Sequence, residues 1–447
     1  MTFSHRREPL LLLLGDVIVL YFSLWAMLAA RYWNIPDEAK LQAHLLPFTF
    51  LFAVWIGVFF IAGLYEKHTS LLKGRIGSLI LNTQLVNSFI AVLFFYLIPY
   101  FGITPKTNLF IYLVFSFLLL FAWRVYLFPS LEVTEKQNAI LIGTGEEMKE
   151  LEEEVNNNTR YNLYFISSLE LDEIGGFDFQ EEILKRIYAE NVHIIAADFR
   201  SEKVEPLLPS LYNLIFSQVR FIDMHKIYED IFDRVPLSLV KYSWFLENIS
   251  GAAQKSYDIL KRAMDIMLAL ILGIISLLLY PLVVIAIKLD DGGPILFWQE
   301  RVGQNNKIFK VVKFRSLKSH NDPEGIAKSP QPTKVGKFLR RTRIDELPQV
   351  WNVLKGNLSM IGPRPEIPSL VKHYEKEIPY YNVRHLIKPG LSGWAQLYGE
   401  HAHHATNVSQ TKNKLSYDLY YIKNRSLTLD LKVALRTIKI LLSREGI

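Results

Sequence analysis

The amino-acid sequence contains no cysteine. Disulfide bonds, thiolate catalysis and cysteine-based metal sites are therefore excluded, whereas the cellular compartment stays open. No motif typical of nucleic-acid-binding proteins is present either, so basic regions of this chain call for another explanation. What the 447 residues have in abundance is hydrophobicity: half of them are apolar, which is high for a soluble protein. The length predicts two or three domains.

Negative charge is scarce where positive charge gathers. Residues 131–250 contain 23 acidic and 11 basic side chains, a net charge of −12, whereas residues 251–447 contain 16 acidic and 30 basic ones, a net charge of +14. A basic surface suits anionic lipid or an anionic substrate, and an acidic one repels lipid headgroups and nucleic acid. The last part of the chain is therefore expected to act on an anion.

Long apolar runs occupy the first 130 residues. Four of them are each about long enough to cross a bilayer as a helix, and they cover approximately residues 9–30, 44–65, 79–100 and 108–130. Asp16 in the first run and Arg124 in the fourth lie at similar depth from the same side. We expect them to form an ion pair, the alternative being that each side chain reaches the interface separately.

The loops between these runs differ in basic residues, which predicts the orientation of the chain. Basic residues gather before the first run and between the second and third: Arg6, Arg7, Lys67, Lys73 and Arg75. The positive-inside rule then places the N-terminus in the cytoplasm. Four spans return the chain to that side, so everything after about residue 131 is expected to be cytoplasmic.

Residues 132–250 alternate strand-like and helix-like segments, which predicts a doubly wound α/β domain. The first strand-like run ends at Gly143-Thr144-Gly145, as in a dinucleotide-binding turn. The third glycine of that fingerprint is replaced by Met148. A tight strand–turn–helix needs glycine for packing alone, so both a structural and a nucleotide-binding interpretation stay open.

A fifth apolar run, about Met264 to Leu289, differs from the first four because Pro281 interrupts it and basic residues flank both ends. Proline inside a helix removes a hydrogen bond and bends or breaks the helix. The run is either a kinked fifth span or a helix that dips into the membrane and returns to the same face. A fifth span would carry the remaining chain outside the cell, away from nucleotide-activated substrates.

The most informative stretch runs from Arg340 to Glu366, RRTRIDELPQVWNVLKGNLSMIGPRPE. Adjacent carboxylates, Asp345 and Glu346, follow three arginines, and Arg364 lies between two prolines. Arginine can hold phosphate oxygens in two-point contact, and a carboxylate can attack phosphorus or hold a metal. The alternative is a surface helix with ordinary ion pairs.

This stretch resembles the signature of the bacterial sugar transferases, the monotopic polyprenyl-phosphate phosphoglycosyl transferases. Three further motifs match in order: KFRS at residues 313–316, KPGLSGWAQ at 388–396 and YDLYYIK at 417–423. The resemblance covers roughly Ser256 to the C-terminus. The whole chain is similar to the large members of the family.

The resemblance implies roles for individual residues. Asp345 matches the catalytic nucleophile. Glu346 matches the second member of the dyad and is expected to organise Mg²⁺ or a proton, and the two carboxylates are the expected metal ligands. Pro281 matches the break of a re-entrant helix, about 258–289, although many members have Ser-Pro where this chain has Tyr280-Pro281. The residues expected to bind phosphate are Arg340, Arg364, Lys313 and Arg315.

The implied reaction is transfer of a sugar-1-phosphate from a UDP-sugar to polyprenyl (undecaprenyl) phosphate, with release of UMP, as the first membrane step of polysaccharide synthesis. The implied protein is a homodimer in the bacterial inner membrane, in contact with lipid and not with nucleic acid. We expect four transmembrane helices at 1–131, a degenerate Rossmann-like cytoplasmic domain at 132–250 and a mixed α/β catalytic domain at 251–447.

Two alternatives belong to other classes. The protein could be a catalytically inactive scaffold in polysaccharide assembly, which the intact Asp-Glu pair disfavours. A nucleotide-sugar dehydratase would need the complete glycine fingerprint and a Tyr-x-x-x-Lys pair, which occurs here only at Tyr257 and Lys261. His401, His403 and His404 form a cluster that could bind a metal but is more typical of an exposed loop. No motif indicates which sugar is transferred.

Overall fold

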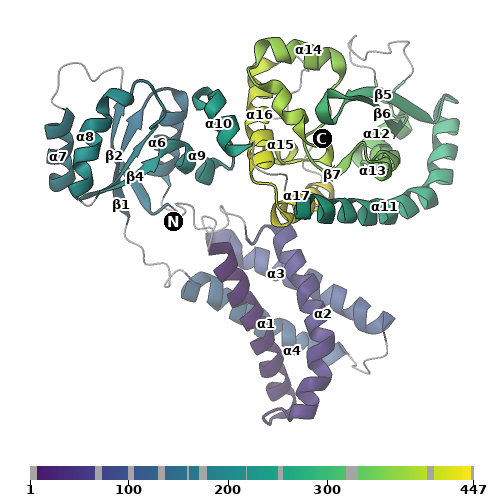
Figure 1. Cartoon of the computed structure of the whole chain (residues 1–447). Helices are drawn as coiled ribbons and strands as arrows, with labels where there is room; N and C mark the ends of the chain where they lie inside the picture. Colours follow the sequence, from purple (N-terminus) through teal and green to yellow (C-terminus); the bar gives the residue numbers. More distant parts are fainter. Residues whose placement is uncertain are drawn as a thin grey trace. The chain divides into compact units, whose positions relative to one another are not determined.

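The computed structural model describes residues 8–65, 73–98, 105–128, 136–158, 161–170, 179–217, 219–249, 255–318, 331–399 and 407–443. The chain divides into two compact units, Met1–Ile231 and Phe232–Ile447 (Figure 1).

The first unit begins with four long apolar helices, drawn in purple and blue in Figure 1: α1 (Glu8–Tyr32), α2 (Glu38–Ala62), α3 (Lys73–Leu97) and α4 (Pro105–Ala122), the last continued by a π-helical turn at Trp123–Leu127. All four lie where the sequence predicted spans and are long and apolar enough to cross a membrane. Large aromatic side chains such as Phe48, Trp55 and Tyr112 pack in the core between the helices. Outward-facing residues such as Phe89 and Phe110 are exposed, as expected where lipid rather than water surrounds the protein.

The predicted ion pair between Asp16 and Arg124 is confirmed. Both residues are buried, and the Arg124 guanidinium contacts the Asp16 carboxylate through two nitrogens. Tyr65 donates a hydrogen bond to the same carboxylate at 2.6 Å, and Arg124 also donates to the Leu64 carbonyl at 2.8 Å. The pair thus joins α1, the end of α2 and the π-helical turn, which explains why two charges are tolerated among apolar helices.

The second part of this unit is an α/β domain with a four-stranded parallel sheet in the order β2-β1-β3-β4. Its strands are β1 (Gln137–Gly143), β2 (Leu163–Glu170), β3 (Val192–Ala197) and β4 (Arg220–Asp223). Its helices are α6 (Glu146–Asn157), α7 (Phe179–Ala189), α8 (Leu208–Asn213) and α9 (Met224–Phe232). The central strands β1 and β3 are almost continuously apolar and buried, as is typical of a parallel sheet covered on both faces.

The second unit, green to yellow in Figure 1, contains a mixed set of short helices and strands. Its helices are α10 (Tyr242–Asn248), α11 (Lys255–Asp290), α12 (Lys334–Arg341), α13 (Val350–Lys355), α14 (Pro368–Glu377), α15 (Trp394–Tyr398), α16 (Val408–Lys423) and α17 (Leu427–Ser443). The strands form two pairs: β5 (Leu296–Val302) antiparallel to β6 (Ile308–Phe314), and β7 (Ser359–Ile361) parallel to β8 (Gly390–Ser392). Apolar helices and a mixed α/β C-terminal part together fit the predicted membrane protein.

The second unit starts at Phe232, whereas the sequence placed residues up to 250 in the middle domain. Val235 and Trp244 are buried in the same core as Trp394. The Trp394 indole donates to the Asp233 carbonyl at 2.9 Å, and the Val235 amide donates to the Ser416 carbonyl at 3.2 Å. These contacts tie residues 232–249 to the C-terminal unit.

Helix α11 continues as one helix from Lys255 to Asp290, with Pro281 inside it. In Figure 1 it nevertheless bends, so that its two arms follow two sides of the C-terminal unit. The first arm, before Pro281, packs through Ala269 against Val311 and Val353. The second arm packs through Val283 against Phe314. Both arms therefore rest on one compact unit, while their remaining apolar side chains are exposed.

Candidate active site

The Asp345-Glu346 pair lies on a short 3₁₀ helix, Ile344–Gln349, between α12 and α13. Thr333 caps α12 by accepting a hydrogen bond from the Gly336 amide, and α12 ends before Arg343. Arg343 has φ of 55°, a left-handed conformation that is uncommon for a residue other than glycine. The chain turns at this residue and directs the two carboxylates inward.

Asp345 is a buried carboxylate with an oxygen left free. Only 6% of the residue is exposed, and its Oδ1 has no hydrogen-bond partner among the residues that the structure describes. Burial, together with the neighbouring charge of Glu346, raises the pKa of Asp345 to about 6. The group is thus ionised at neutral pH but poorly stabilised, which favours reaction with an electrophile.

Glu346 has the opposite environment. Its Oε1 lies 2.7 Å from Lys313 Nζ, and Arg343 and Arg364 lie at 3.9 and 4.0 Å. Burial opposes ionisation of this carboxyl, but Lys313 and Arg364 outweigh burial and lower its pKa to about 2. Two adjacent carboxyls with pKa values pushed apart are typical of sites where each has a different role.

Arg364 is positioned by two glycine-containing loops that lie backbone against backbone. The Gly362 amide donates to the Ser392 carbonyl at 2.8 Å, and the Gly390 amide donates to the Pro363 carbonyl at 2.9 Å. A Cβ added at Gly362 would lie 2.5 Å from the Lys388 carbonyl oxygen, and one at Gly390 only 2.1 Å from the Gly362 nitrogen. Side chains at these glycines are therefore excluded, which explains why GPRP and KPGLSG need them.

The structure brings two of the four predicted phosphate-binding residues together in one pocket and leaves the other two outside it. Lys313 and Arg364 line a pocket beside Glu346, whereas Arg340 is exposed at the end of α12, from where its charge lowers the pKa of Asp345 against the effect of burial. Arg315, which is buried, instead forms an ion pair with Asp291 at the surface. The pocket is lined by Arg301, Val311, Lys313, Glu346, Gln349, Arg364, Pro365, Gly390 and Leu391.

Comparison with known proteins shows the family to which the C-terminal part is similar. Residues 256–444 match the family model described as bacterial sugar transferase. An exopolysaccharide production protein of Rhizobium leguminosarum bv. phaseoli is 38% identical over 190 residues, which are 40% of this chain and 94% of that protein. The chain belongs to the bacterial sugar transferase family.

Other similar members of the sugar transferase family are longer. The UDP-N-acetylgalactosamine-undecaprenyl-phosphate N-acetylgalactosaminephosphotransferase of Aeromonas hydrophila is 42% identical over 214 residues, covering 46% of this chain and 50% of that protein. The UDP-glucose:undecaprenyl-phosphate glucose-1-phosphate transferase of Escherichia coli K12 is 42% identical over 187 residues, covering 40% and 39%. The chain thus matches half or less of the length of these two relatives.

Sequence reasoning about this sugar transferase missed Arg301. Its guanidinium donates to the Pro365 carbonyl at 2.9 Å, lies 3.9 Å from Glu366 and lines the same pocket as Lys313. Arg301 on β5 and Lys313 on β6 face the same side of the ladder because side chains alternate along strands, and Phe297 pairs with Lys313. The alternation of side chains in QERVG was the available signal for Arg301. It could not place Arg301 beside Lys313 without the register between β5 and β6.

The dyad of the sugar transferase also fits a hard divalent cation. Mg²⁺ prefers oxygen ligands and is typically bound by one or two carboxylates plus substrate phosphates. Asp345 offers an unpartnered buried oxygen and Glu346 an ionised carboxylate beside it. Within the described ranges, no group of three His, Cys, Asp or Glu side chains could form an all-protein metal site. The predicted histidine cluster at 401–404 lies outside the described residues.

Proposed function

We propose that the protein transfers a sugar-1-phosphate from a UDP-sugar to polyprenyl phosphate and releases UMP, as the first membrane step of polysaccharide synthesis. The observation that carries this proposal is an adjacent pair of carboxyls, one buried and one partly buried, with separated pKa values at a pocket lined by Lys313, Arg301 and Arg364. The names of the Aeromonas and Escherichia coli relatives support the two substrate classes.

In the proposed reaction, the free oxygen of Asp345 attacks the phosphorus that bears the sugar. A bond forms between Asp345 and that phosphorus, and the bond from phosphorus to the oxygen bridging the two phosphates breaks, so that UMP leaves. An oxygen of the polyprenyl phosphate then attacks the same phosphorus. The aspartyl–phosphorus bond breaks, polyprenyl-diphosphate-sugar forms and the Asp345 carboxylate is restored.

The cationic side chains offset negative charge on the transferring group. Arg364 is about two-fifths exposed and reaches the pocket from a loop held by two backbone contacts. Preorganised cations of this kind supply the main stabilisation in phosphoryl transfer, because little covalent chemistry is left for the protein. Asp345 and Glu346 would hold Mg²⁺, which supplies further charge neutralisation on the phosphates when bound.

We also propose that α11 is a re-entrant helix, that the catalytic unit lies on the cytoplasmic face of the bacterial inner membrane and that the protein is a homodimer. The contacts of both arms of α11 with one compact unit support the return of the helix, because a straight helix of 36 residues would extend about 54 Å. The aromatic rings of Tyr280 and Phe314, whose centroids are 5.5 Å apart, pack the bend of α11 against β6.

The middle domain is proposed to be a degenerate Rossmann-like module with a structural role. The parallel strands of its sheet, in the order β2-β1-β3-β4, support this proposal, and so does the packing around Gly143. A Cβ at Gly143 would lie 3.3 Å from the Met224 sulfur and 3.4 Å from the Met148 sulfur. Methionine side chains thus press on the turn that a dinucleotide phosphate would approach.

The topology can be measured because the natural chain has no cysteine. A cysteine introduced at exposed Lys307 is expected to react with a membrane-impermeant maleimide only from the cytoplasmic side. Cysteine at Asn34, in the loop between α1 and α2, is the matched control and should react only from outside. Pro281→Leu should shift part of the Lys307→Cys signal outward and lower activity. Outward labelling of Lys307→Cys in the chain with Pro281 intact would rule out the re-entrant helix.

The activity itself is tested by UMP release. Purified protein with polyprenyl phosphate is expected to release UMP from at least one member of a panel of UDP-sugars, including UDP-glucose, UDP-galactose and N-acetylated sugars. Omission of polyprenyl phosphate should leave at most one UMP per active site. A properly folded protein that releases no UMP from any member would favour the scaffold alternative.

A further inference from the structure

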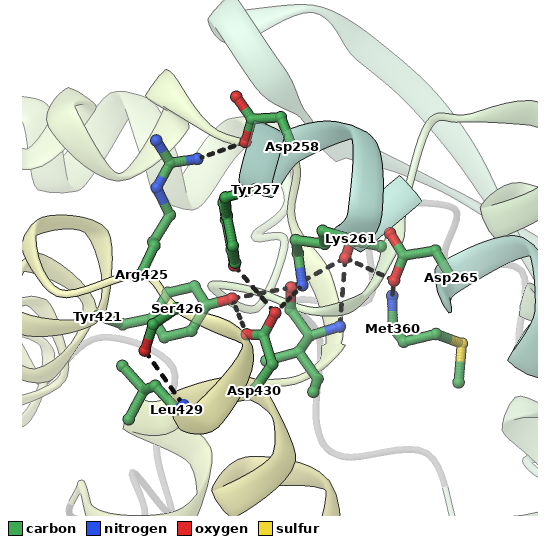
Figure 2. Close-up of polar contacts among 12 residues, drawn as sticks. Tyr257, Asp258, Lys261, Asp265, Met360, Tyr421, Arg425, Ser426, Leu429 and Asp430 are labelled. Atoms are coloured by element: carbon green, nitrogen blue, oxygen red, sulfur yellow. Dashed lines mark hydrogen bonds and ion pairs between the residues drawn. The ribbon is translucent and has the colours of Figure 1, made fainter. Parts of the chain in front are cut away.

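The first arm of α11 carries a polar stripe on one face. Tyr257, Lys261 and Asp265 are spaced four residues apart, so their side chains lie above one another along the helix. Figure 2 shows that these side chains point toward other elements of the C-terminal unit. Contact with lipid does not explain these polar side chains. Their hydrogen-bond partners within the protein therefore indicate the role of the stripe.

Two members of the stripe anchor the helix to α17. The Tyr257 hydroxyl and the Lys261 ammonium each donate to Asp430 Oδ2 at 2.9 Å (Figure 2). Tyr421 donates to the other oxygen of Asp430 at 2.6 Å, and Asp430 is almost completely buried. This anchor fixes where the first arm of α11 lies against the unit.

The third member, Asp265, contacts a different element. Its Oδ1 accepts a hydrogen bond from the Met360 amide at 2.9 Å (Figure 2). The same oxygen accepts a second hydrogen bond from the Ser359 hydroxyl at 3.1 Å. Asp265 is 5% exposed, and hydrogen bonds to a buried carboxylate are among the stronger ones. Met360 and Ser359 belong to β7, so the carboxylate holds the backbone of that strand.

Strand β7 leads directly into the loop that carries Arg364. It ends at Ile361, and Gly362 and Pro363 follow before Arg364. Pro363 restricts the backbone, and Gly362 is pressed against the Lys388 carbonyl, so the connection has little freedom to absorb a displacement of β7. A shift at Met360 is therefore passed on to Arg364.

We propose that Asp265 is a positioning residue for the transferase site. By holding β7, Asp265 keeps Arg364 close to Asp345 and Glu346. The inference rests on the proposed function, because Arg364 is assigned there to the transferring phosphate. It links the membrane-inserted helix to the catalytic geometry: the carboxylate that fixes the position of the arginine belongs to the helix itself.

The test compares UMP release by Asp265→Ala and Asp265→Asn in the full-length protein, with rates normalised to the amplitude of the single-turnover burst. Asp265→Ala removes the acceptor, and we expect kcat to fall about 10- to 100-fold, since a misplacement of about 1 Å can cost 10²-fold, with KM for polyprenyl phosphate unchanged. Asn keeps the acceptor oxygen and should retain most of the activity. Asp258→Ala is the matched control, because Asp258 lies on the same helix but pairs with Arg425 and is about half exposed.

A double-mutant cycle distinguishes positioning from general stability. In the Arg364→Ala background, Asp265→Ala should reduce kcat less than about threefold, because the group it positions is already gone. If Asp265→Ala does not fold, Ser359→Ala removes one of the two bonds and should show a smaller loss of about 2- to 10-fold that also disappears in that background. Equal losses in both backgrounds, or a loss matched by Asp258→Ala, would overturn the proposal. An unaltered protein without any UMP release would instead contradict the proposed function.

Discussion

Asp345→Asn is expected to lower transfer at least about 10³-fold while the protein still folds, because an amide cannot attack phosphorus. Initial rates of the unaltered protein should give parallel lines in double-reciprocal plots against the two substrates. Incubation with UDP-sugar alone should add the mass of a sugar phosphate to the unaltered chain and not to the variant. Intersecting lines, or substantial turnover by Asp345→Asn, would mean direct attack by the lipid phosphate.

The same variant is expected to be more stable than the unaltered protein at pH 8. The pKa of Asp345 is raised to about 6 by burial, so folding is favoured by the protonated form, and that advantage is lost as pH rises through 6. Above that pH the ionised carboxylate costs on the order of 2–3 kcal/mol, which the neutral amide avoids. Thermal unfolding should therefore show a higher Tm for Asp345→Asn at pH 8 and a difference that shrinks toward pH 4. A Tm difference independent of pH would contradict the raised pKa.

Lys313→Met is expected to lower both the stability and the activity of the protein. It leaves the partly buried Glu346 carboxylate without its nearest cation, and the cost should approach the lower end of the about 3–5 kcal/mol typical of breaking a fully buried ion pair. The pKa of Glu346 should rise from about 2, since burial then opposes ionisation with less compensation. UMP release should fall about 10²-fold or more through the loss of a preorganised cation. Lys313→Arg is the control and should retain stability better than it retains activity.

A double variant separates the two contributions of Lys313. Lys313→Met combined with Glu346→Leu removes both charges, and apolar replacement of a buried pair is often neutral for stability. We therefore expect the Tm to recover toward that of the unaltered protein while UMP release stays low. Recovery of both Tm and activity would show that the pair has only a structural role.

Local patterns in the sequence were sufficient to predict the apolar helices and the adjacency of the two carboxylates. The four N-terminal helices follow from runs of apolar residues, which need no partner to be recognised. Asp345 and Glu346 stand next to each other, so any fold of that stretch keeps them together. The partnership of Asp16 and Arg124 was predictable because a membrane offers buried charges few alternatives.

The parts that the sequence did not reveal depend on contacts between distant residues. Lys313 and Arg315 are two residues apart and would share one face of a continued strand, but β6 ends at Phe314. The Arg315 amide still donates to the Ile295 carbonyl at 2.9 Å, but its side chain pairs with Asp291 and does not line the pocket. Arg301 entered the pocket only through the pairing of β5 with β6 and the approach of Pro365. No periodicity within one segment contains that information.

The packing of residues 232–249 into the C-terminal unit bears on how such proteins can be recombined. The family match begins at residue 256, yet Trp244 and Val235, upstream of it, fill the core around Trp394 and Tyr421. A chimera joined at the family boundary would strip these aromatic rings of their cover and expose apolar surface that favours aggregation. The Rhizobium relative, 94% of which the match covers, has little length left for such a segment. Grafts between long and short relatives should therefore be joined before Phe232, so that the inherited piece brings its own cover.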